Sequence, residues 1–346
     1  MTATYFKYIL NFKNPSGTSR GILTEKETWF IILEKDGKKG IGECGLLRGL
    51  SCDDRPDYEQ QLQWTCQNIH LGLDFLWHQL LEFPSIQFGL ETAFQSLESE
   101  NPFVLFPSNF TSGNSQMLIN GLVWMGSESF MKSHIEQKLK DGFKCIKLKI
   151  GALDFDVELG LIRFIRSYFS KNEIEIRVDA NGAFAANDAL EKLKKLAVYD
   201  IHSIEQPILA GQVTDMQLLC KTTPLPIALD EELIGVFKLE EKEQLLKTIK
   251  PQFIILKPSF IGGFKGTAEW ISLAEKYNIG WWITSALESN VGLNAIAQWT
   301  FLQNNSLPQG LGTGGLYTNN FYCPLEVSNG FLSYNTDLNW NCNLIF

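Results

Sequence analysis

The sequence predicts an α/β protein built as a (β/α)7β barrel of the TIM type, with an α+β capping domain formed by the N-terminal region and the C-terminal tail. Three observations support this prediction. Apolar stretches alternate with helical stretches along the middle of the chain, charged residues end successive apolar stretches, and these residues are evenly spaced. They follow one another after roughly 25 to 30 positions, the length of one βα unit. An open, doubly wound parallel sheet is the alternative architecture. The evenly spaced residues are Lys149, Asp179, Glu205, Asp230 and Lys257.

Composition excludes several classes of protein. The chain has 346 residues, of which 45% are hydrophobic and 20% charged, as expected for a globular protein with one large and one smaller domain. Its net charge of −9 argues against a nucleic-acid partner. Seven scattered cysteines without a C-x-x-C pair indicate a reducing compartment. No apolar stretch is long enough to span a membrane and no signal peptide is recognisable, so we expect a cytoplasmic enzyme without a membrane partner. The oligomeric state is left open.

The N-terminal region, residues 1–110, is expected to form most of the capping domain. Residues 1–50 alternate between apolar and polar positions, as antiparallel strands do, and Asp36-Gly37 is typical of a hairpin turn. Glycine, proline and polar residues predict one loop between the first strand and the strands that follow it, and a second loop after those strands. Apolar residues near a 3.6-residue period predict helices after the second loop. The expected loops lie at residues 13–26, which we expect to be mobile, and 46–56; the expected helices lie at 58–82 and 88–100.

The barrel itself is expected to occupy residues 111–320. Its strands are short and apolar on both faces, as in a parallel sheet that helices cover on the outside. A helix at residues 128–140, ended by Asp141-Gly142, marks the first βα unit. No eighth helix is recognisable, and residues 321–346 are expected to pack back on the capping domain. The eight expected strands lie at residues 118–124, 145–150, 174–179, 201–205, 227–230, 253–257, 280–285 and 310–313.

Asp179, Glu205 and Asp230 end three consecutive strands of the expected barrel. The C-terminal ends of parallel barrel strands meet at one mouth, so we expect the three carboxylates to converge there. Magnesium prefers a few carboxylates together with water and substrate oxygens. The sequence therefore predicts a Mg²⁺ site, with Mn²⁺ as a substitute. The alternative is that each acid caps the helix that follows its strand.

Lysine residues flank the three acids. Lys147 and Lys149 stand two positions apart on one strand, so both side chains point to the same face. Charges inside a barrel need anionic partners, which the carboxylates and a carboxylate substrate would provide. Lys257 ends the sixth strand and is subject to the same argument. The alternative is that these side chains follow an apolar surface out to solvent.

Other polar residues near strand ends are candidates for substrate binding. Arg177 shares a strand face with Asp179 and is expected either to hold a substrate carboxylate or to neutralise the acids. Ser285 and Ser289 follow the seventh strand, where helix capping is the alternative role. Gly312 lies in a glycine-rich segment whose backbone amides can face an anion. The partner that these contacts predict is a small-molecule carboxylate.

The histidines are not expected to take part in the site. None of them ends an expected barrel strand on the carboxylate face, and His202, three positions before Glu205, points the other way. Their positions argue against a histidine base, a Ser-His pair and a zinc site. Acid–base chemistry is therefore assigned to lysine. The four residues are His70, His78, His134 and His202.

The K-x-K motif, followed by D, E, D and K at successive strand ends, resembles the enolase superfamily, in particular its muconate-lactonizing subgroup. The resemblance covers nearly the whole chain. It implies that the three acids bind Mg²⁺ and that Lys149 and Lys257 are the catalytic lysines on either side of a substrate, with Lys147 adding positive charge. Within the subgroup, the segments RVDAN (177–181), SALES (285–289) and GLGTGGLYTNN (310–320) are most similar to the o-succinylbenzoate synthase family.

This resemblance implies a carbon–oxygen lyase of menaquinone biosynthesis, which dehydrates 2-succinyl-6-hydroxy-2,4-cyclohexadiene-1-carboxylate to o-succinylbenzoate through proton abstraction and a metal-stabilised enediolate. N-acylamino acid racemase, dipeptide epimerase and muconate cycloisomerase are the alternatives within the subgroup. Dipeptide epimerases usually carry an Asp-x-Asp element near the eighth strand, where this chain has Gly312-Thr313-Gly314. A binding module without catalysis and a metal-dependent hydrolase are the alternatives from other classes.

Overall fold

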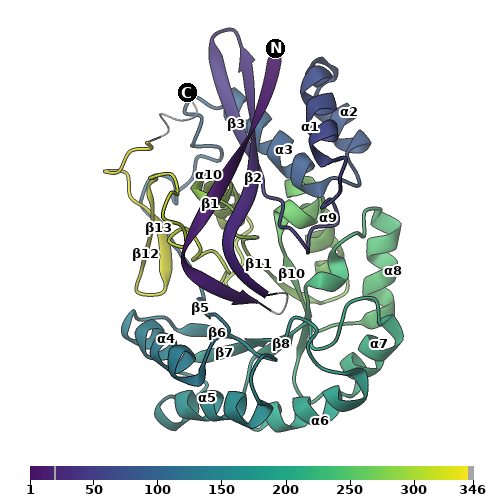
Figure 1. Ribbon diagram of the computed structural model, residues 1–346, viewed down its shortest axis with the longest axis vertical. Coiled ribbons are helices and arrows are strands. Elements are labelled where there is room, and N and C mark those ends of the chain that lie inside the picture. Colours follow the sequence, from purple (N-terminus) through teal and green to yellow (C-terminus); the bar gives the residue numbers. More distant parts are fainter. Residues whose placement is uncertain (19–20, 342–346) are drawn as a thin grey trace.

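The N-terminal residues form a three-stranded antiparallel sheet in the computed structural model, which describes residues 1–18 and 21–341 (Figure 1). Asp36 and Gly37 have positive φ angles of 52° and 76°, as a two-residue hairpin turn requires, so the predicted turn is confirmed. Trp29, Ile31 and Leu33 alternate along the second strand and are buried against the helices that follow. The strands are β1 (Thr2–Thr18), β2 (Gly21–Lys35) and β3 (Lys38–Cys44).

Three short helical elements replace the single helix predicted at residues 58–82. The first helix ends at Gln67, a 3₁₀ turn follows, and the chain turns again at Gly72, whose positive φ angle of 82° glycine adopts without strain. The prediction of one continuous helix is therefore wrong, although the apolar spacing continues because both helices pack on the same core. Pro84 is the first residue of the next helix, a position where its missing N–H is not needed. The elements are α1 (Tyr58–Gln67), the 3₁₀ turn η1 (Ile69–Leu71), α2 (Leu73–Gln79) and α3 (Pro84–Glu98).

Residues 13–26 do not form the predicted loop in the part that the structure describes. β1 continues to Thr18 and β2 begins at Gly21, and a register shift between Asn11 and Ser16 accommodates the irregular sequence around Pro15. Gly17 forms an isolated bridge with Met125 of the barrel, where a Cβ atom would lie 2.5 Å from the Met125 carbonyl oxygen. The paired strands therefore extend as a long hairpin over the barrel. Of the predicted loop, residues 19 and 20 lie outside the described residues.

The middle of the chain forms a parallel sheet of seven strands, in the order β11-β10-β9-β8-β7-β6-β5, with helices on its outer side (Figure 1). The strands are β5 (Gly121–Val123), β6 (Cys145–Lys149), β7 (Glu175–Asp179), β8 (Ser203–Glu205), β9 (Ile227–Leu229), β10 (Phe253–Leu256) and β11 (Gly280–Ile283). The helices are α4 (Glu128–Lys140), α5 (Phe155–Tyr168), α6 (Ala186–Ala197), α7 (Val213–Thr222), α8 (Leu239–Ile249), α9 (Gly263–Lys276) and α10 (Asn290–Leu302), with 3₁₀ turns η2 (Glu231–Leu233) and η3 (Pro258–Phe260).

Two residues close the sheet into a barrel. Gly310 forms a parallel bridge with Thr284, directly after β11, and Gln309 forms one with Ile119, directly before β5. The eighth strand predicted at residues 310–313 is thus reduced to this short connection between the two edges. Glycine is needed at position 310, because a Cβ atom there would lie 2.1 Å from the Thr284 hydroxyl oxygen. The fold is the predicted (β/α)7β barrel with an α+β cap.

The first barrel strand differs from the prediction. In place of one strand at residues 118–124 the chain forms β5 and a separate strand β4 (Gln116–Leu118), which pairs antiparallel with the C-terminal hairpin of β12 (Leu325–Ser328) and β13 (Phe331–Tyr334). The division allows the chain to leave one sheet and enter another within a few residues. The final segment also contacts the N-terminal sheet, since Phe321 packs edge-on against Phe30 with ring centroids 5.5 Å apart. Residues 342–346 lie outside the described residues.

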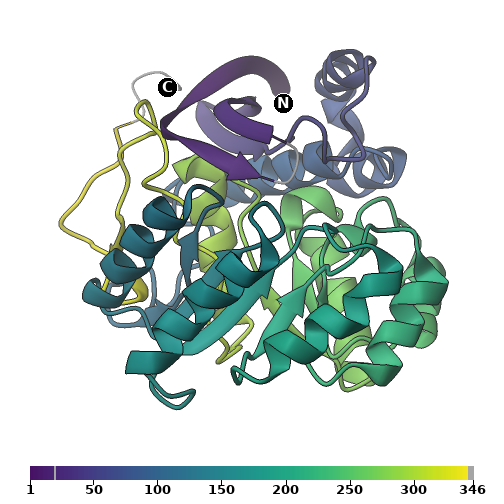
Figure 2. The same ribbon diagram turned by 60° about the horizontal axis from the view of Figure 1, so that its bottom comes forward.

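Figure 2 shows the N-terminal sheet above the barrel, so that residues near the start of the chain face the ends of the barrel strands. No helix within residues 1–18 and 21–341 is long and apolar enough to cross a membrane. The cysteines in this part of the chain are free thiols; they are Cys44, Cys52, Cys66, Cys145, Cys220 and Cys323.

Candidate active site

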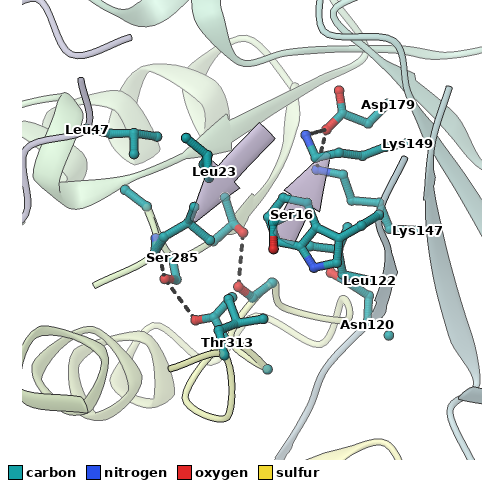
Figure 3. Close-up of a pocket in the computed structure, with 18 of the residues that line it drawn as sticks. Ser16, Leu23, Leu47, Asn120, Leu122, Lys147, Lys149, Asp179, Ser285 and Thr313 are labelled. Carbon is teal, nitrogen blue, oxygen red and sulfur yellow. Dashed lines mark hydrogen bonds and ion pairs between the residues drawn. The ribbon is translucent and has the colours of Figure 1, made fainter. Parts of the chain in front are cut away.

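A cavity of about 600 Å³ lies between the mouth of the barrel and the hairpin of β1 and β2 (Figure 3). Ser16 and Leu23 enter it from the hairpin, and Leu47 enters it from the loop after β3. A cavity of this volume accommodates a small organic molecule. From the barrel, the lining includes Asn120, Leu122, Lys147, Lys149, Asp179, Asn181, Lys257, Ser285, Gly312 and Thr313.

The register of the parallel strands brings the charged residues to one level. Lys149 of β6 is the partner of Asp179 in β7, and Asp179 is the partner of Glu205 in β8. Asp230 directly follows β9, and Lys257 directly follows β10. All five residues therefore lie at the C-terminal ends of neighbouring strands. The short strands end there because each charged residue follows a buried apolar run and the chain then turns into a loop or 3₁₀ turn.

Lysine ammonium groups lie directly against the buried carboxylates. Lys147 Nζ is 2.9 Å from Asp179 Oδ2 and also forms an ion pair with Glu205. Lys149 Nζ lies 3.0 Å from the same Asp179 oxygen. On the other side of the mouth, Lys257 Nζ forms an ion pair with Asp230. The lysine side chains line the cavity and the carboxylates of Glu205 and Asp230 lie behind them, almost fully buried.

The charges of these groups are strongly coupled. Burial alone would raise the pKa of Asp179, but the ammonium groups of Lys147 and Lys149 outweigh it and hold that pKa well below the usual range. Burial, with repulsion from Asp179 and Asp230, raises the pKa of Glu205 well above its usual range despite the contact with Lys147. The positive charge of Lys147 therefore does not fully compensate for the burial of the Glu205 carboxylate. The Glu205 Oε1 atom is buried without a hydrogen-bond partner among the described residues.

Lys147 and Lys257 are held in the charged form. Burial lowers the pKa of Lys147, but Asp179 and Glu205 outweigh this effect and raise the pKa overall. The same balance, with Asp230 and Glu205 as the nearest acids, raises the pKa of Lys257. Neither lysine gives up its proton readily, so both are suited to stabilising negative charge.

Asn181 and Glu231 belong to the site although the sequence analysis gave them no role. Lys149 Nζ donates to Asn181 Oδ1 at 2.6 Å, and Asn181 Nδ2 donates to Glu231 Oε1 at 2.8 Å. Both Asn181 and Asp179 therefore hold the Lys149 amine. The signal was present in the RVDAN and LDEE segments, where each residue lies one or two positions beyond a strand-end acid.

Arg177 is not part of the cavity lining. It pairs with Lys147 in the strand register, one pleat repeat below Asp179, which is about 7 Å along the strand. Its Nε atom donates to Glu175 at 2.7 Å, and Nη1 donates to the Pro308 carbonyl at 2.8 Å. Arg177 therefore does not reach the cavity, and its two predicted roles, holding a substrate carboxylate or neutralising the acids, stay predictions. The shared strand face was right, but the depth along the barrel was not.

The two serines predicted as substrate contacts have other partners. Ser285 lines the cavity, but its hydroxyl donates to Glu288 at 2.7 Å and accepts from Thr313 and from the Leu287 amide, each at 2.9 Å. Its hydrogen-bonding capacity is thus used within the protein. Ser289 is buried outside the cavity and donates to Glu43 at 2.5 Å. Ser289 therefore does not line the cavity, whereas Ser285 and Gly312 do, and the substrate-binding roles of these residues stay predictions.

One histidine contributes to the cavity wall. His134 of α4 is among the lining residues, whereas His202 is stacked near Phe253 and Trp282 at the other end of the barrel. Burial, with repulsion from Lys138, lowers the pKa of His134, which favours the neutral ring. The strand-end pattern could not predict this role, because His134 lies on a barrel helix and not at the end of a strand.

The described residues do not gather three or more histidine, cysteine or acidic side chains as closely as a metal-ligand set. Ammonium groups lie against the carboxylates instead, as the Lys147 contacts with Asp179 and Glu205 demonstrate. The donor chemistry is nevertheless that of a hard divalent cation, because carboxylate oxygens end three adjacent strands. The unpartnered, buried Glu205 Oε1 atom is a free ligand atom of the right kind.

Comparison with known proteins connects both layers of the fold with one family. Residues 131–337 match the family described as Enolase C-terminal domain-like, and residues 1–97 match the MenC N-terminal domain. The chain is 45% identical to an o-succinylbenzoate synthase from Desulfotalea psychrophila, over 96% of this chain and 98% of that protein. It is 30% identical to a D-Ala-D/L-Ala epimerase from Cytophaga hutchinsonii, over 84% of this chain and 81% of the epimerase.

Solved structures agree with this relationship. The crystal structure of MenC from Desulfotalea psychrophila superposes with a TM-score of 0.86 at 42% identity, over 96% of this chain and 99% of that one. The match includes the cap as well as the barrel, since nearly the full length of each chain is covered. The matched families and the identity over almost the entire length show that the chain belongs to the enolase superfamily and, within it, to the o-succinylbenzoate synthase family.

Proposed function

We propose that the cavity dehydrates 2-succinyl-6-hydroxy-2,4-cyclohexadiene-1-carboxylate to o-succinylbenzoate, a step of menaquinone biosynthesis. The observation that carries this proposal is the charge of the cavity lining. Among the described lining residues, six are lysine or arginine and Asp179 is the one carboxylate. This substrate has two carboxylates, one on the ring and one on the succinyl tail, and a basic lining suits a dianion. The basic residues are Lys13, Arg48, Lys138, Lys147, Lys149 and Lys257.

Epimerisation of a dipeptide is the competing activity within the superfamily, and the glycine-rich segment disfavours it. A dipeptide carries an α-ammonium group, which needs a carboxylate or several acceptors when it leaves water. Gly310, Gly312, Thr313 and Gly315 line this side of the cavity, and none of them has an acidic side chain. The 45% identity to an o-succinylbenzoate synthase, against 30% to an epimerase, supports the same choice.

Lys149 is the proposed base. In its neutral form, the Lys149 amine takes the proton from the ring carbon that bears the carboxylate. The bond to hydroxide on the neighbouring carbon breaks, the new ring double bond forms, and the Lys149 ammonium returns its proton to the hydroxide to release water. One amine can perform both transfers when the proton and hydroxyl leave from the same face of the ring. Aromaticity of the product favours the reaction.

Lys257 and Lys147 supply fixed positive charge. Lys257 directly follows β10, and three strands separate β10 from the β6 strand that carries Lys149, so the two amines face the substrate from different sides of the mouth. Its ammonium group would stabilise the negative charge that develops on the ring by charge and cation–π attraction. Lys147 lies behind Lys149 and would stabilise the ring carboxylate.

Members of the enolase superfamily are generally Mg²⁺-dependent, and we propose that Asp179, Glu205 and Asp230 hold Mg²⁺ in this chain. When bound, the ion supplies a Lewis acid for the substrate carboxylate. Glu205 has an unpartnered oxygen for this purpose. Lys147 and Lys257 contact these acids in the structure and would keep the site from carrying excess negative charge before the substrate arrives.

The direct test is a product assay. We expect purified protein with Mg²⁺ to convert the cyclohexadiene substrate into o-succinylbenzoate, followed by the change in ultraviolet absorbance and by chromatography. Dipeptides and N-acylamino acids, incubated in D₂O with the protein, are expected to exchange their α-proton at least about a hundredfold more slowly than the cyclohexadiene substrate is dehydrated. For dipeptides the reason is that the glycine-rich side of the cavity has no acidic side chain to pair with the ammonium group. Efficient epimerisation together with no acceleration of dehydration would reject the assignment while leaving the superfamily membership intact.

Asn181 provides a further test of the site. Asn181→Ala removes the 2.6 Å contact to Lys149 Nζ, so the amine can rotate away from the position set by Asp179. We expect kcat for dehydration to fall by about 10- to 100-fold with little change in KM, because misplacement by about 1 Å has effects of this size. The exposed Asn187 on α6 provides a control, and Asn187→Ala is expected to behave as wild type. An unchanged kcat for Asn181→Ala would show that Asp179 alone positions the base.

A further inference from the structure

Gln206 directly follows Glu205 at the end of β8 and takes no part in the proposed proton transfers. Its side chain is 1% exposed and is not among the described residues that line the cavity. A buried carboxamide needs partners for its oxygen and for both of its N–H groups. The residue also has a φ angle of 38°, which side chains other than glycine rarely adopt. A strained, buried residue beside an acid of the proposed metal site indicates a role in shaping that site.

The carboxamide of Gln206 joins the end of β8 to the end of β9. Its Oε1 atom accepts from the Asp230 amide at 3.2 Å and from the Glu232 amide at 3.3 Å. Its Nε2 atom donates to the Glu232 carboxylate at 3.1 Å and to the Ile208 carbonyl at 3.0 Å. The side chain therefore uses both its acceptor and its donor capacity in full. Asp230, the acid that follows β9, is held through its own backbone amide.

Backbone hydrogen bonds of Gln206 connect the same strand end to β7 and β9. Its carbonyl accepts from the Gly182 amide, in the loop after β7, at 2.7 Å. Its amide donates to the Ala228 carbonyl of β9 at 2.9 Å. One residue thus ties together the ends of the three neighbouring strands that carry the acids of the proposed metal site.

Glu232 completes this connection from the 3₁₀ turn η2. One of its carboxylate oxygens accepts from Gln206, and the other accepts from the Gly211 amide, in the loop between β8 and α7, at 3.0 Å. The loop after β8 and the turn after β9 therefore hold each other through two buried side chains. We call Gln206, Asp230 and Glu232 the strand-end brace.

The strand-end brace restricts the distance between two proposed metal ligands. Glu205 is joined to Gln206 by a peptide bond, and Asp230 donates to the Gln206 side chain. The backbones that carry the two carboxylates cannot separate without leaving a buried polar group unpaired. Mg²⁺ requires near-ideal octahedral geometry with oxygens at about 2.1 Å, whereas Ca²⁺ accepts more oxygens at longer and more variable distances. A fixed set of carboxylates therefore favours the smaller ion, and a relaxed set loses that preference.

We propose that Gln206 is a positioning residue that fixes Glu205 and Asp230 relative to each other and thereby makes the site selective for Mg²⁺ over Ca²⁺. Gln206 acts through the backbone of the two acids and not as a ligand. The inference rests on the proposed metal site, to which it adds a residue and a selectivity between ions. Partners that orient the ligands of a metal commonly affect its affinity by about 10- to 100-fold.

Gln206→Met tests the proposal, because it keeps the length of the side chain and removes all of its hydrogen bonds. In calorimetric titrations of the full chain with each ion alone, we expect the affinity for Mg²⁺ to fall by about tenfold, since displaced carboxylates no longer fit octahedral geometry. The affinity for Ca²⁺ should change by less than about threefold. The ratio of the Mg²⁺ affinity to the Ca²⁺ affinity should therefore fall by at least about threefold.

Gln298→Met is the matched control. Gln298 is a fully buried residue of α10, and its side chain accepts from the Phe106 amide at 3.0 Å. It donates to the Phe103 carbonyl at 2.7 Å and to Asn294 at 2.8 Å. The same substitution at this position also removes buried hydrogen bonds, but it leaves the strand ends of the metal site intact. The affinity ratio of this variant should equal that of wild type, even if its stability falls as much as that of Gln206→Met.

Three results would overturn the proposal. They are an unchanged affinity ratio in Gln206→Met, an equal fall of the ratio in Gln298→Met, and a wild type without preference for Mg²⁺ over Ca²⁺. Should Gln206→Met fail to fold, Gln206→Asn gives the same decision. Asparagine keeps a carboxamide but withdraws it by one carbon from the Asp230 and Glu232 amides, so the ratio must fall in this variant too.

Hydrogen–deuterium exchange tests the strand-end brace without metal and without substrate. The Asp230 and Glu232 amides donate to Gln206, so a peptide covering residues 227–234 should take up deuterium faster in Gln206→Met than in wild type or Gln298→Met. Equal uptake would contradict the proposal. If wild type selects Mg²⁺ but forms no o-succinylbenzoate, the proposed dehydration fails, while the titrations still decide the role of Gln206.

Discussion

Replacing Lys149 with alanine is expected to reduce kcat for the dehydration by about 10³- to 10⁴-fold, the largest effect of any single substitution in this chain. The variant lacks the amine that takes the ring proton and returns it to the leaving hydroxide, and general acid–base catalysis is worth up to about 10⁴-fold. Lys147 and Lys257 cannot replace it, because the acids beside them raise the pKa of both. Initial rates of o-succinylbenzoate formation at saturating substrate measure the loss.

Two further variants separate the role of the amine from that of its charge. Lys149→Arg keeps a positive charge but cannot become a base, so we expect it to be no more active than Lys149→Ala. Lys144→Ala changes an exposed lysine just before the same strand and is expected to leave kcat unchanged. Recovery of substantial activity in Lys149→Arg would mean that this residue acts through charge, and that another group is the base.

Removal of divalent cations is expected to abolish the activity. After dialysis against EDTA, dehydration should fall to the spontaneous rate and return on addition of Mg²⁺, with Mn²⁺ as a substitute, because the substrate carboxylate would lack its Lewis acid. Glu205→Gln should weaken Mg²⁺ binding by at least about tenfold in calorimetric titration, since one anionic ligand becomes neutral. The fold should persist, as the three acids lie at the mouth of the barrel and not in its packed layers.

The calorimetric titration keeps metal binding distinct from catalysis. Glu191→Gln, an exposed acid on α6, serves as the matched control and should bind Mg²⁺ as wild type does. Full activity after exhaustive dialysis against EDTA would overturn the metal assignment. Equal Mg²⁺ affinity in Glu205→Gln and wild type would instead remove Glu205 from the ligand set while leaving a metal requirement in place.

The barrel could be predicted from the sequence because its regularity is local. A polar residue after each buried apolar run, repeated once per βα unit, determines both the strand order and the level at which Lys149, Asp179 and Glu205 meet. Features that depend on contacts between residues distant in sequence were harder to predict. The helix predicted at residues 58–82 is interrupted between Gln67 and Leu73, and the described part of the loop predicted at residues 13–26 is a strand pair that contacts a barrel residue, Met125.

The site was predictable in its charges and not in its hydrogen bonds. Strand spacing places a side chain on the correct face, but it does not reveal depth along the barrel, so the sequence could not show that Arg177 lies outside the cavity lining. Nor does it reveal whether a hydroxyl is already occupied, as that of Ser285 is. Asn181 was overlooked because its role comes from a contact with Lys149, on the preceding barrel strand 32 residues earlier.

The hairpin that reaches into the cavity has a consequence for how such enzymes diversify. Ser16 and Leu23 touch the space for the substrate, yet they belong to a strand pair whose register already shifts between Asn11 and Ser16. Insertion or loss of residues at that irregularity would alter which side chains select the substrate, without moving any barrel strand. The hairpin residues of the cavity lie in a different part of the sequence from the charged residues at the barrel strand ends, so this part of the lining can change under mutation while the strand-end residues stay in place.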